Sequence, residues 1–336
     1  MKMTSERYSR QTLFKGIGHE GQQKISQKHV LIVGMGALGT HVAEGLVRAG
    51  IKTLSIVDRD YIEFSNLQRQ TLFTEEDANT MLPKVVAAER HLKALRHDLK
   101  LKTFITHVDY YFLDKYAKHV DLIIDATDNF ETRQLINDFS FKENIPWIYG
   151  GVVQSTYIEV AFVPGETPCF NCLMPQLPAI NLTCDTVGVI QPAVTMTTSF
   201  QLRDAFKLLT EQSVPTKLTY GDIWDGQHFT FGFSRMFRKE CPTCGSNPSF
   251  PYLNKQHTLY ATLCGRDTVQ YENDKISQEM VREFLKQHHL NYRENKYMIM
   301  FEYKGHRIVS FEGGRMLIHG TTKTLDAIHL INQLFG

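Results

Sequence analysis

The residues with the clearest chemical signature lie between Asp58 and Gln70, in the segment DRDYIEFSNLQRQ. The segment follows a glycine-rich turn, where an ordinary dinucleotide site needs one acidic residue for a ribose and little else. Here the acidic residue is followed by a dense group of Asn, Gln and Arg side chains, which suit contacts to phosphate groups. The segment therefore predicts a nucleotide that is consumed in the reaction, not one that only carries hydride.

The glycine-rich turn has the pattern GxGxxG, formed by Gly34, Gly36 and Gly39. It lies between an apolar strand expected at 29–33 and a helix expected at 40–49, which is the context that gives this short motif its meaning. Glycine allows a tight turn and lets a nucleotide approach the backbone. Asp58 lies 24 positions after Gly34, at the end of the next strand, where a carboxylate can accept hydrogen bonds from ribose hydroxyls. The alternative is a turn that serves the fold alone.

Two cations and one carboxylate extend this pattern. Arg69 is a permanent planar cation and Lys84, at the start of the next helix, supplies a point charge, so both suit phosphate contacts; the alternative is a solvated surface run. Asp128 follows another core strand, where the carboxyl ends of strands line a ligand crevice, and is a candidate Mg²⁺ ligand. The alternative for Asp128 is to cap a helix that begins near Asn129.

Two Cys-x-x-Cys pairs form a second candidate site, Cys169 with Cys172 and Cys241 with Cys244. Both pairs lie in turn-rich segments, and four thiolates complete the tetrahedral shell of Zn²⁺. A closed shell leaves no position for substrate, so we expect a structural zinc that ties a long loop to the end of the main domain. A thioredoxin-like redox pair is the alternative.

The periodicity of the chain predicts an α/β fold with a Rossmann-like mixed sheet, flanking helices, the structural zinc knuckle and a small α+β C-terminal module. Strands at 29–33 and 52–57 flank the helix at 40–49 as a βαβ unit with parallel strands. We expect an ATP-binding adenylation domain at 1–245, a linker at 246–270 and an accessory module at 271–336. In that module Ser277 should cap a helix, and Leu325, Ile328, Ile331 and Leu334 should share the buried face of the last one.

The overall charge is nearly balanced, with 37 Lys and Arg residues against 36 Asp and Glu residues in 336. Such a balance does not favour nucleic acid or a membrane surface as a partner. The chain has no signal-peptide pattern at its start and no run of about 18 apolar residues that could span a bilayer. A cytoplasmic protein is the expectation.

The motifs, taken in order, resemble those of the MoeB/ThiF family, bacterial relatives of the ubiquitin-activating enzymes. The resemblance covers about residues 5–245. It implies that ATP and Mg²⁺ are used to adenylate the C-terminal Gly-Gly of a ubiquitin-like sulfur carrier protein. Motifs that carry it are RYSRQ at 7–11, GMGALG at 34–39, DRD at 58–60, SNLQRQ at 65–70, Pro83-Lys84, ATDN at 126–129, both cysteine pairs and Thr183-Cys184.

The resemblance also implies roles for individual residues. Asp58 would hold the ribose within an ATP site that includes Asp60 and the three glycines. Phosphate contacts would come from Asn66, Arg69 and Lys84, and Asp128 would hold Mg²⁺. Arg10 would reach into the active site of the neighbouring subunit of a homodimer.

The implied chemistry needs no general base. The attacking carboxylate is already ionised near pH 7, so catalysis consists mainly of positioning and of stabilising charge on the phosphates. Cys184 is a further candidate, since family members carry a cysteine in this loop that can join the carrier covalently; the alternative is a loop residue without a chemical role.

One segment of the sequence bears on the identity of the carrier. Residues 181–184 favour a MoaD-like carrier in molybdopterin biosynthesis, and a ThiS-like carrier in thiamine thiazole biosynthesis is the alternative. Two other classes are a non-catalytic subunit of an activating enzyme and an NAD-dependent oxidoreductase. The last would leave Asn66, Lys84 and Asp128 without a role. The C-terminal module has no rhodanese nucleophile and no terminal Gly-Gly, so its role is open.

Overall fold

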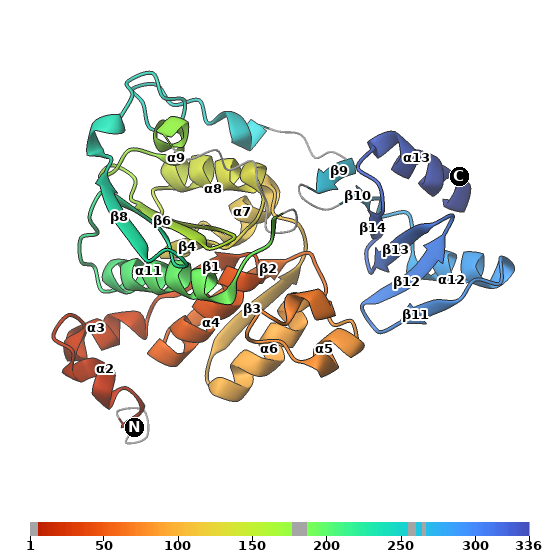
Figure 1. The fold of residues 1–336 in the computed structure, drawn as a ribbon, viewed down its shortest axis with the longest axis horizontal. Helices are drawn as coiled ribbons and strands as arrows, with labels where there is room; N and C mark the ends of the chain where they lie inside the picture. Colours follow the sequence, from red (N-terminus) through yellow and green to blue (C-terminus); the bar gives the residue numbers. More distant parts are fainter. Residues whose placement is uncertain (1–5, 177–186, 255–259, 264–266, 336) are drawn as a thin grey trace. The chain divides into compact units, whose positions relative to one another are not determined.

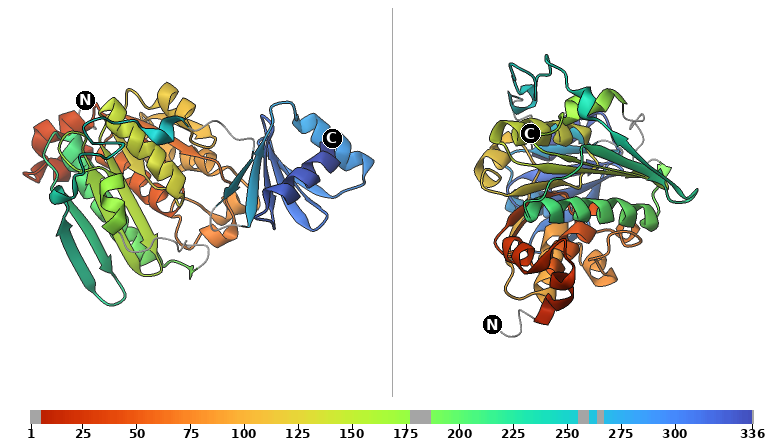
Figure 2. Two further views of the ribbon diagram at one scale, coloured as in Figure 1. Left: turned by 90° about the horizontal axis from the view of Figure 1, so that it is seen from above. Right: turned by 90° about the vertical axis from the view of Figure 1, so that its left-hand side faces the viewer.

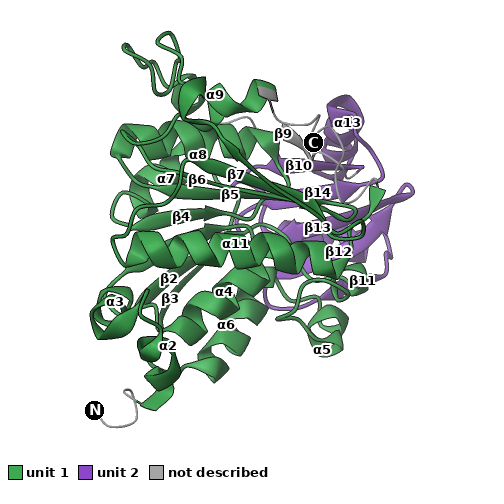
Figure 3. Cartoon of the chain, turned by 60° about the vertical axis from the view of Figure 1, so that its left-hand side comes forward, with its two compact units in different colours: residues 1–255 green, residues 256–336 purple. Residues whose placement is uncertain are grey.

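The computed structural model describes residues 6–176, 187–254, 260–263 and 267–335. The chain forms two compact units, Met1–Lys255 and Gln256–Gly336, each built around its own β-sheet (Figures 1 and 3). The predicted glycine turn, its companions and both cysteine pairs all lie in the first unit.

The first unit contains an eight-stranded mixed sheet with the order β3-β2-β1-β4-β5-β6-β7-β8. The first five strands in this order run parallel, and β6, β7 and β8 are antiparallel to their neighbours. The strands are β1 (His29–Val33), β2 (Thr53–Asp58), β3 (Lys100–Ile105), β4 (Leu122–Asp125), β5 (Trp147–Val153), β6 (Thr156–Phe162), β7 (Lys217–Asp222) and β8 (Gln227–Gly232).

Helices cover both faces of this sheet, which confirms the predicted fold class (Figure 3). One face packs against α3 (Gly18–Ile25), α4 (Ala37–Ala49), α6 (Lys84–Leu95) and α11 (Gln191–Leu209). The other packs against α7 (Tyr110–Tyr116), α8 (Phe130–Glu143) and α9 (Phe170–Leu173). The central strands β1 and β4 are mostly apolar and not alternating, because both faces of the sheet are buried there. The first unit also contains two short helices, α2 (Ser9–Leu13) and α5 (Glu75–Asn79).

The βαβ unit predicted at the start of the domain is present as β1, α4 and β2. Helix α4 buries Leu38, Val42 and Leu46, a spacing that places the three side chains on one face. The helix ends at Gly50, whose φ of 100° is the left-handed conformation in which glycine has no Cβ penalty. Strand β1 lies between β2 and β4. The chain adds β2 and β3 on one side of β1 and then crosses to add β4 and β5 on the other side. Open α/β sheets bind ligands at such a switch point.

The second unit is a six-stranded antiparallel sheet of order β11-β12-β13-β14-β10-β9 with two helices. Ser277 caps the first helix by accepting a hydrogen bond from the Met280 N–H, as predicted. The elements are β9 (Tyr260–Leu263), β10 (Thr268–Glu272), α12 (Gln278–Gln287), β11 (Tyr292–Glu294), β12 (Met298–Tyr303), β13 (His306–Phe311), β14 (Arg315–His319) and α13 (Thr324–Phe335).

Two details of the second unit differ from the prediction. Strand β9 and the first three residues of β10 fall within residues 246–270, the interval expected to be a linker. Helix α13 buries Ala327, Leu330, Ile331 and Leu334, whereas Leu325 is 70% exposed. The predicted set differs from the buried one because seven of the twelve residues of this helix are apolar and lie on more than one side, so periodicity alone does not select one stripe.

Among the residues that the structure describes, no helix has the length and apolar character needed to cross a membrane.

Candidate nucleotide site and cysteine cluster

The carboxyl ends of β1, β2 and β4 meet at one edge of the large sheet. Val33 is the register partner of both Val57 and Asp125, so the residues that follow these strands are neighbours. The Gly34 N–H donates to the Val57 carbonyl at 2.9 Å, and the Ala126 N–H donates to the Val33 carbonyl at 2.9 Å. The fold therefore gathers the glycine turn, the end of β2 and the segment after β4, as the sequence predicted.

The three glycines of the turn meet different surroundings. A Cβ on Gly34, whose φ is 95°, would lie 2.6 Å from the Ala126 carbonyl oxygen, and one on Gly39 would lie 2.0 Å from the Gly34 carbonyl oxygen. These two positions need glycine for the protein's own packing. Among the described residues other than its chain neighbours, the atom nearest to a Cβ on Gly36 would be the Gln70 Nε2, at 3.9 Å. The space over Gly36 is thus open, as required for the close approach of a ligand.

Asp58 lies at the centre of this edge. Its two carboxylate oxygens accept hydrogen bonds from the N–H groups of Met35 at 2.6 Å and Asp60 at 2.7 Å, which fixes the side chain between the glycine turn and the end of β2. Burial raises the pKa of Asp58, and the positive charge of Lys84 opposes that shift. Each oxygen keeps a second lone pair, so the carboxylate can still accept a ribose hydroxyl.

Lys84 is brought to the same place from the start of α6. Its N–H donates to the Asp60 carbonyl at 2.9 Å, and its Nζ lies 3.5 Å from Asp60 Oδ2. The side chain is only 3% exposed, so the alternative of a solvated surface lysine is wrong. The buried ammonium thus lies beside Asp60 and acts on Asp58 through its charge, and a positive charge buried here favours the binding of an anion such as phosphate.

The segment Asn66–Gln70 folds back onto the glycine turn. Asn66 is buried and its Oδ1 accepts from the Glu63 N–H at 3.1 Å, which closes the 3₁₀ turn Phe64–Asn66. Arg69 is half-buried and donates from Nη1 to the Ser65 carbonyl at 2.9 Å. Gln70 is 3% exposed, and within the described part of the chain its Oε1 has no hydrogen-bond partner. An orphaned buried acceptor beside the open space over Gly36 fits a bound nucleotide.

Asp128 is exposed in the loop between β4 and α8. The cap of α8 is its neighbour Asn129, whose Oδ1 accepts from the N–H groups of Glu131 at 2.8 Å and Thr132 at 3.1 Å. The capping role considered for Asp128 therefore belongs to Asn129, and Asp128 is presented at the strand edge where a cation could be held.

Asp125 and Arg133 support this loop and were missed by the sequence analysis. Arg133 donates from Nε to Asp125 Oδ2 at 3.1 Å and from Nη2 to the Thr127 carbonyl at 2.6 Å. Burial raises the pKa of Asp125, against the attraction of Arg133 and the hydrogen bonds from Thr127. An acidic residue at the end of a core strand with an arginine eight positions later was the available signal. A third partner, the Gln201 Nε2 that donates to the Asp125 carbonyl at 2.9 Å, gave no local signal.

The remaining two predicted residues are not placed at this site. Arg10 is exposed on α2. Cys184 lies outside the described residues.

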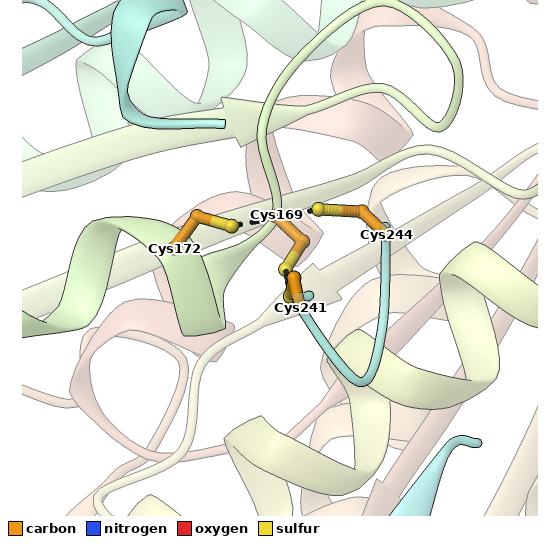
Figure 4. Close-up of side chains that lie close together, drawn as sticks. All are labelled: Cys169, Cys172, Cys241 and Cys244. Carbon is orange, nitrogen blue, oxygen red and sulfur yellow. Dashed lines mark hydrogen bonds between the residues drawn. The ribbon is translucent and has the colours of Figure 1, made fainter. Parts of the chain in front are cut away.

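The four predicted zinc ligands do converge (Figure 4). The Sγ atoms of Cys169, Cys172, Cys241 and Cys244 all lie within 4.8 Å of one another. The Sγ distances from Cys169 to Cys241 and from Cys172 to Cys244 are 3.4 and 3.5 Å, and none of the four forms a disulfide. Four sulfurs around a tetrahedral Zn²⁺ at about 2.3 Å are separated by about 3.8 Å, which this cluster approaches.

The protonation of the cluster also fits a cation. The Cys244 thiol and burial raise the pKa of Cys169 far above its ordinary value. Burial opposes ionisation of Cys241 as well, but hydrogen bonds from the N–H groups of Cys244 and Thr243 and from the thiols of Cys169 and Cys172 together lower the pKa of Cys241 to about 7. One thiolate forms readily, but ionising further thiols next to this negative charge costs free energy. All four cysteines therefore ionise only when a divalent cation is bound. The donor set and its spacing suit structural zinc, not a two-cysteine redox site.

Comparison with known proteins identifies the family of this chain. Residues 8–245 match the model of the ThiF family. The sulfur carrier protein ThiS adenylyltransferase of Bacillus subtilis is 40% identical over 98% of this chain and 99% of its own length. The molybdopterin-synthase adenylyltransferase of Escherichia coli is 31% identical over 71% of this chain and 96% of its own length.

Among solved structures, E. coli MccB in a crystal with ATP resembles the chain with a TM-score of 0.62 at 24% identity, over 71% of this chain and 74% of that one, which supports the fold. The family match spans the large sheet, the glycine turn and the four cysteines. This chain therefore belongs to the ThiF family.

Proposed function

We propose that the protein adenylates the C-terminal carboxylate of a ubiquitin-like sulfur carrier protein, with ATP as the second substrate. The observation that carries the proposal is the open space over Gly36, which the Gln70 side chain with its orphaned acceptor borders. The buried Lys84, paired with Asp60 just after β2, adds a positive charge to this edge of the sheet. A carrier carboxylate oxygen attacks the α-phosphorus, the new C(O)–O–P bond forms, and the bond to the β-phosphate oxygen breaks to release pyrophosphate. No proton is transferred, in agreement with a site built from cations and amides.

We assign the site residues the roles that the family resemblance implies, and their positions are compatible with these roles. Asp58 binds the ribose hydroxyls with its remaining lone pairs, and Asn66, Arg69 and Lys84 contact the phosphates. Asp60 orients Lys84 through the 3.5 Å ion pair. Asp128 holds Mg²⁺, which offsets the repulsion between the anionic carboxylate and ATP. Asp125 and Arg133 keep the Asp128 loop in place.

The proposed assembly is a homodimer. Arg10 lies on an exposed helix whose neighbours Leu13 and Phe14 are 71% and 66% exposed, an apolar pair that a second subunit would cover. In such a dimer Arg10 contributes to the site of the partner subunit.

A ThiS-type carrier is the better-supported partner. The B. subtilis relative, named for ThiS, is matched over nearly its whole length and this whole chain, whereas the E. coli relative named for molybdopterin synthase is less identical and matches a shorter part. The comparisons thus favour the alternative from the sequence analysis over the MoaD-like carrier that residues 181–184 suggested.

An aromatic surface on the hairpin β7–β8 supports a protein substrate. Strands β7 and β8 form a hairpin at one edge of the large sheet (Figure 2). Phe229 and Phe231 of the edge strand β8 are 44% and 53% exposed with ring centroids 6.2 Å apart, and Trp224 in the connecting turn is 80% exposed. We name these three residues the hairpin aromatic patch. Exposed aromatic groups of this kind mark protein interfaces, and we propose that the folded body of the carrier docks here.

The proposal is tested by exchange of labelled pyrophosphate into ATP, with Mg²⁺ and purified carriers. We expect exchange that depends on a ThiS-type carrier and is weak with a MoaD-type one. Exchange with the MoaD-type carrier alone would reverse the pathway assignment, and no exchange with either would refute adenylation. Arg69→Ala and Asp128→Ala should each reduce the rate at least about a hundredfold if they stabilise charge on the phosphates.

A further inference from the structure

Four buried polar side chains lie beside the cysteine cluster. Asn137 and Asp138 belong to α8, Asn171 lies between Cys169 and Cys172, and Thr243 lies between Cys241 and Cys244. Asn137 and Asp138 are 0% exposed, Asn171 is 9% exposed and Thr243 is 2% exposed. Polar groups buried this deeply are stable only when they are paired, and these four pair mainly with one another.

The Thr243 hydroxyl is the centre of the group. It donates to Asp138 Oδ1 at 2.5 Å and accepts from the Nδ2 atoms of Asn171 at 2.7 Å and Asn137 at 3.3 Å. A hydroxyl has one proton and two lone pairs, so its hydrogen-bonding capacity is fully used. The second knuckle is thereby joined to the first knuckle and to α8 without a metal ion.

Helix α8 also holds the flanks of both knuckles. Asn137 Oδ1 accepts from the N–H of Phe170, the residue after Cys169, at 2.9 Å. Asp138 Oδ2 accepts from the Tyr252 N–H at 2.9 Å, which fixes the chain that follows Cys244. Two successive side chains of one helix therefore reach both cysteine pairs.

We infer that Asn137, Asp138 and Thr243 preorganise the four-thiolate site and thereby set its affinity for zinc. In small zinc domains the metal creates the fold, because the ligands are apart without it. Here the knuckles are already joined through buried hydrogen bonds and through a helix that belongs to the main core. Metal-free protein should therefore stay folded with the two knuckles together, and this inference does not depend on the adenylation reaction.

Asp138→Asn is the sharpest test of the group. Both carboxylate oxygens accept hydrogen bonds, so an amide NH₂ in place of one oxygen must face either the Thr243 hydroxyl proton or the Tyr252 N–H. Thr243 cannot reverse its hydroxyl, because both of its lone pairs are occupied. We expect Asp138→Asn to lower zinc affinity by about 10- to 100-fold, measured by competition with a chromophoric chelator.

Matched variants separate this role from general destabilisation. Thr243→Val keeps the shape but removes the hydroxyl and should behave like Asp138→Asn, whereas Thr243→Ser keeps the hydroxyl and should bind zinc nearly as the wild type does. Asp77→Asn alters another fully buried carboxylate, paired with His91 at 2.8 Å in α5 and α6, and should leave zinc affinity unchanged.

Two results would overturn the inference. One is wild-type zinc affinity in folded Thr243→Val or Asp138→Asn. The other is loss of the near-ultraviolet circular dichroism of the wild-type protein when a chelator removes the metal, because that signal reports fixed packing of aromatic residues such as Phe170 and Trp147 beside the knuckles. If the variants do not fold, this second measurement on the wild type still decides the question.

Discussion

Gly36 and Gly39 belong to one turn but are glycine for different physical reasons. We expect Gly39→Ala to prevent stable folding, because its Cβ would overlap the Gly34 carbonyl oxygen. Gly36→Ala should change the free energy of unfolding by less than about 1 kcal/mol, since there is room for the methyl group and the position is a helix N-cap where alanine is only modestly worse. It should nevertheless abolish ATP binding measured by calorimetry. Normal binding by Gly36→Ala would contradict a nucleotide seated on this turn.

Lys84 is a buried cation with a proposed role at the phosphates, and its effect on stability can be measured separately from its effect on catalysis. Lys84→Met keeps most of the side-chain volume and removes the ammonium, so we expect a folded protein whose pyrophosphate exchange falls about 100- to 1,000-fold. Lys93 lies on the same helix but forms an exposed ion pair with Glu89 at 2.5 Å, so Lys93→Met is the matched control and should exchange normally. Equal effects of the two substitutions would remove Lys84 from the phosphate site.

Helix α11 packs on the sheet through a buried acidic pair, Glu159 of β6 and Asp204. Arg203 contacts both, with its Nη2 3.2 Å from Glu159 Oε2 and its Nε 2.7 Å from Asp204 Oδ1. One guanidinium cannot neutralise two buried carboxylates. Burial and the charge of Asp204 accordingly raise the pKa of Glu159 well above its ordinary value.

This raised pKa gives a pH dependence with a defined sign. The stability contributed by neutral Glu159 is fully present below the unfolded-state pKa of 4.5 and is lost as the pH rises through the folded-state value. Glu159→Gln stays neutral, so its stability relative to the wild type should increase with pH, by at most about 1.4 kcal/mol per pH unit. Urea unfolding between pH 5 and 8 measures this.

Glu211→Gln is the control for this measurement. Hydrogen bonds to Lys24 and Lys28 lower the pKa of Glu211 below the unfolded-state value of 4.5, so the stability that its charge contributes is fully present above that value and is lost only at lower pH. The stability of Glu211→Gln relative to the wild type should therefore stay constant between pH 5 and 8. A pH-independent difference between Glu159→Gln and the wild type would show that Glu159 is ionised in the folded protein over this range.

The elements that the sequence predicted well are those with local signals. A glycine turn between an apolar strand and a helix identified β1, α4 and β2, and a serine before an amphipathic stretch identified the start of α12. Contacts between residues far apart in the sequence could not be predicted from it. The bond from Gln201 to Asp125 and that from Thr243 to Asp138 join residues 76 and 105 positions apart, and periodicity carries no information on such pairs. The four cysteines are the exception, because metal chemistry itself implies convergence.

The hairpin aromatic patch makes a prediction at the level of an element. Replacing both Phe229 and Phe231 by serine should raise the KM for the carrier at least tenfold, since burying each phenylalanine is worth about 1.5–3 kcal/mol. The KM for ATP and the melting temperature should change little, because both rings are exposed in the isolated chain. Tyr111→Ser, on α7 and 69% exposed, is the control and should leave the carrier KM unchanged. An unchanged carrier KM in the double variant would exclude this docking surface.

At the scale of the whole molecule, the proposed adenylation site and the cysteine cluster belong to the first of the two units. The E. coli relative is matched over nearly its whole length by 71% of this chain, and the family match ends at residue 245. Every described residue assigned to the nucleotide site and the cysteine cluster lies in the first unit. The second unit has a separate hydrophobic core of β-strand and helix residues, including Val269, Phe284, Ile308 and Ile331. Each unit thus meets the main physical condition for folding alone.

We therefore expect a protein truncated after residue 255 to fold, to retain zinc and to catalyse carrier-dependent pyrophosphate exchange with an unchanged KM for ATP. Comparison of its carrier KM with that of the full chain assigns the second unit. An unchanged value excludes carrier binding by residues 256–336, whereas a raised value with unchanged turnover identifies that unit as a second contact for the carrier. Loss of exchange by a folded, zinc-bound truncation would contradict the division, because it would place part of the adenylation machinery in the second unit. The separate fragment 256–336, followed by circular dichroism during thermal unfolding, checks that its core is sufficient for a cooperative transition.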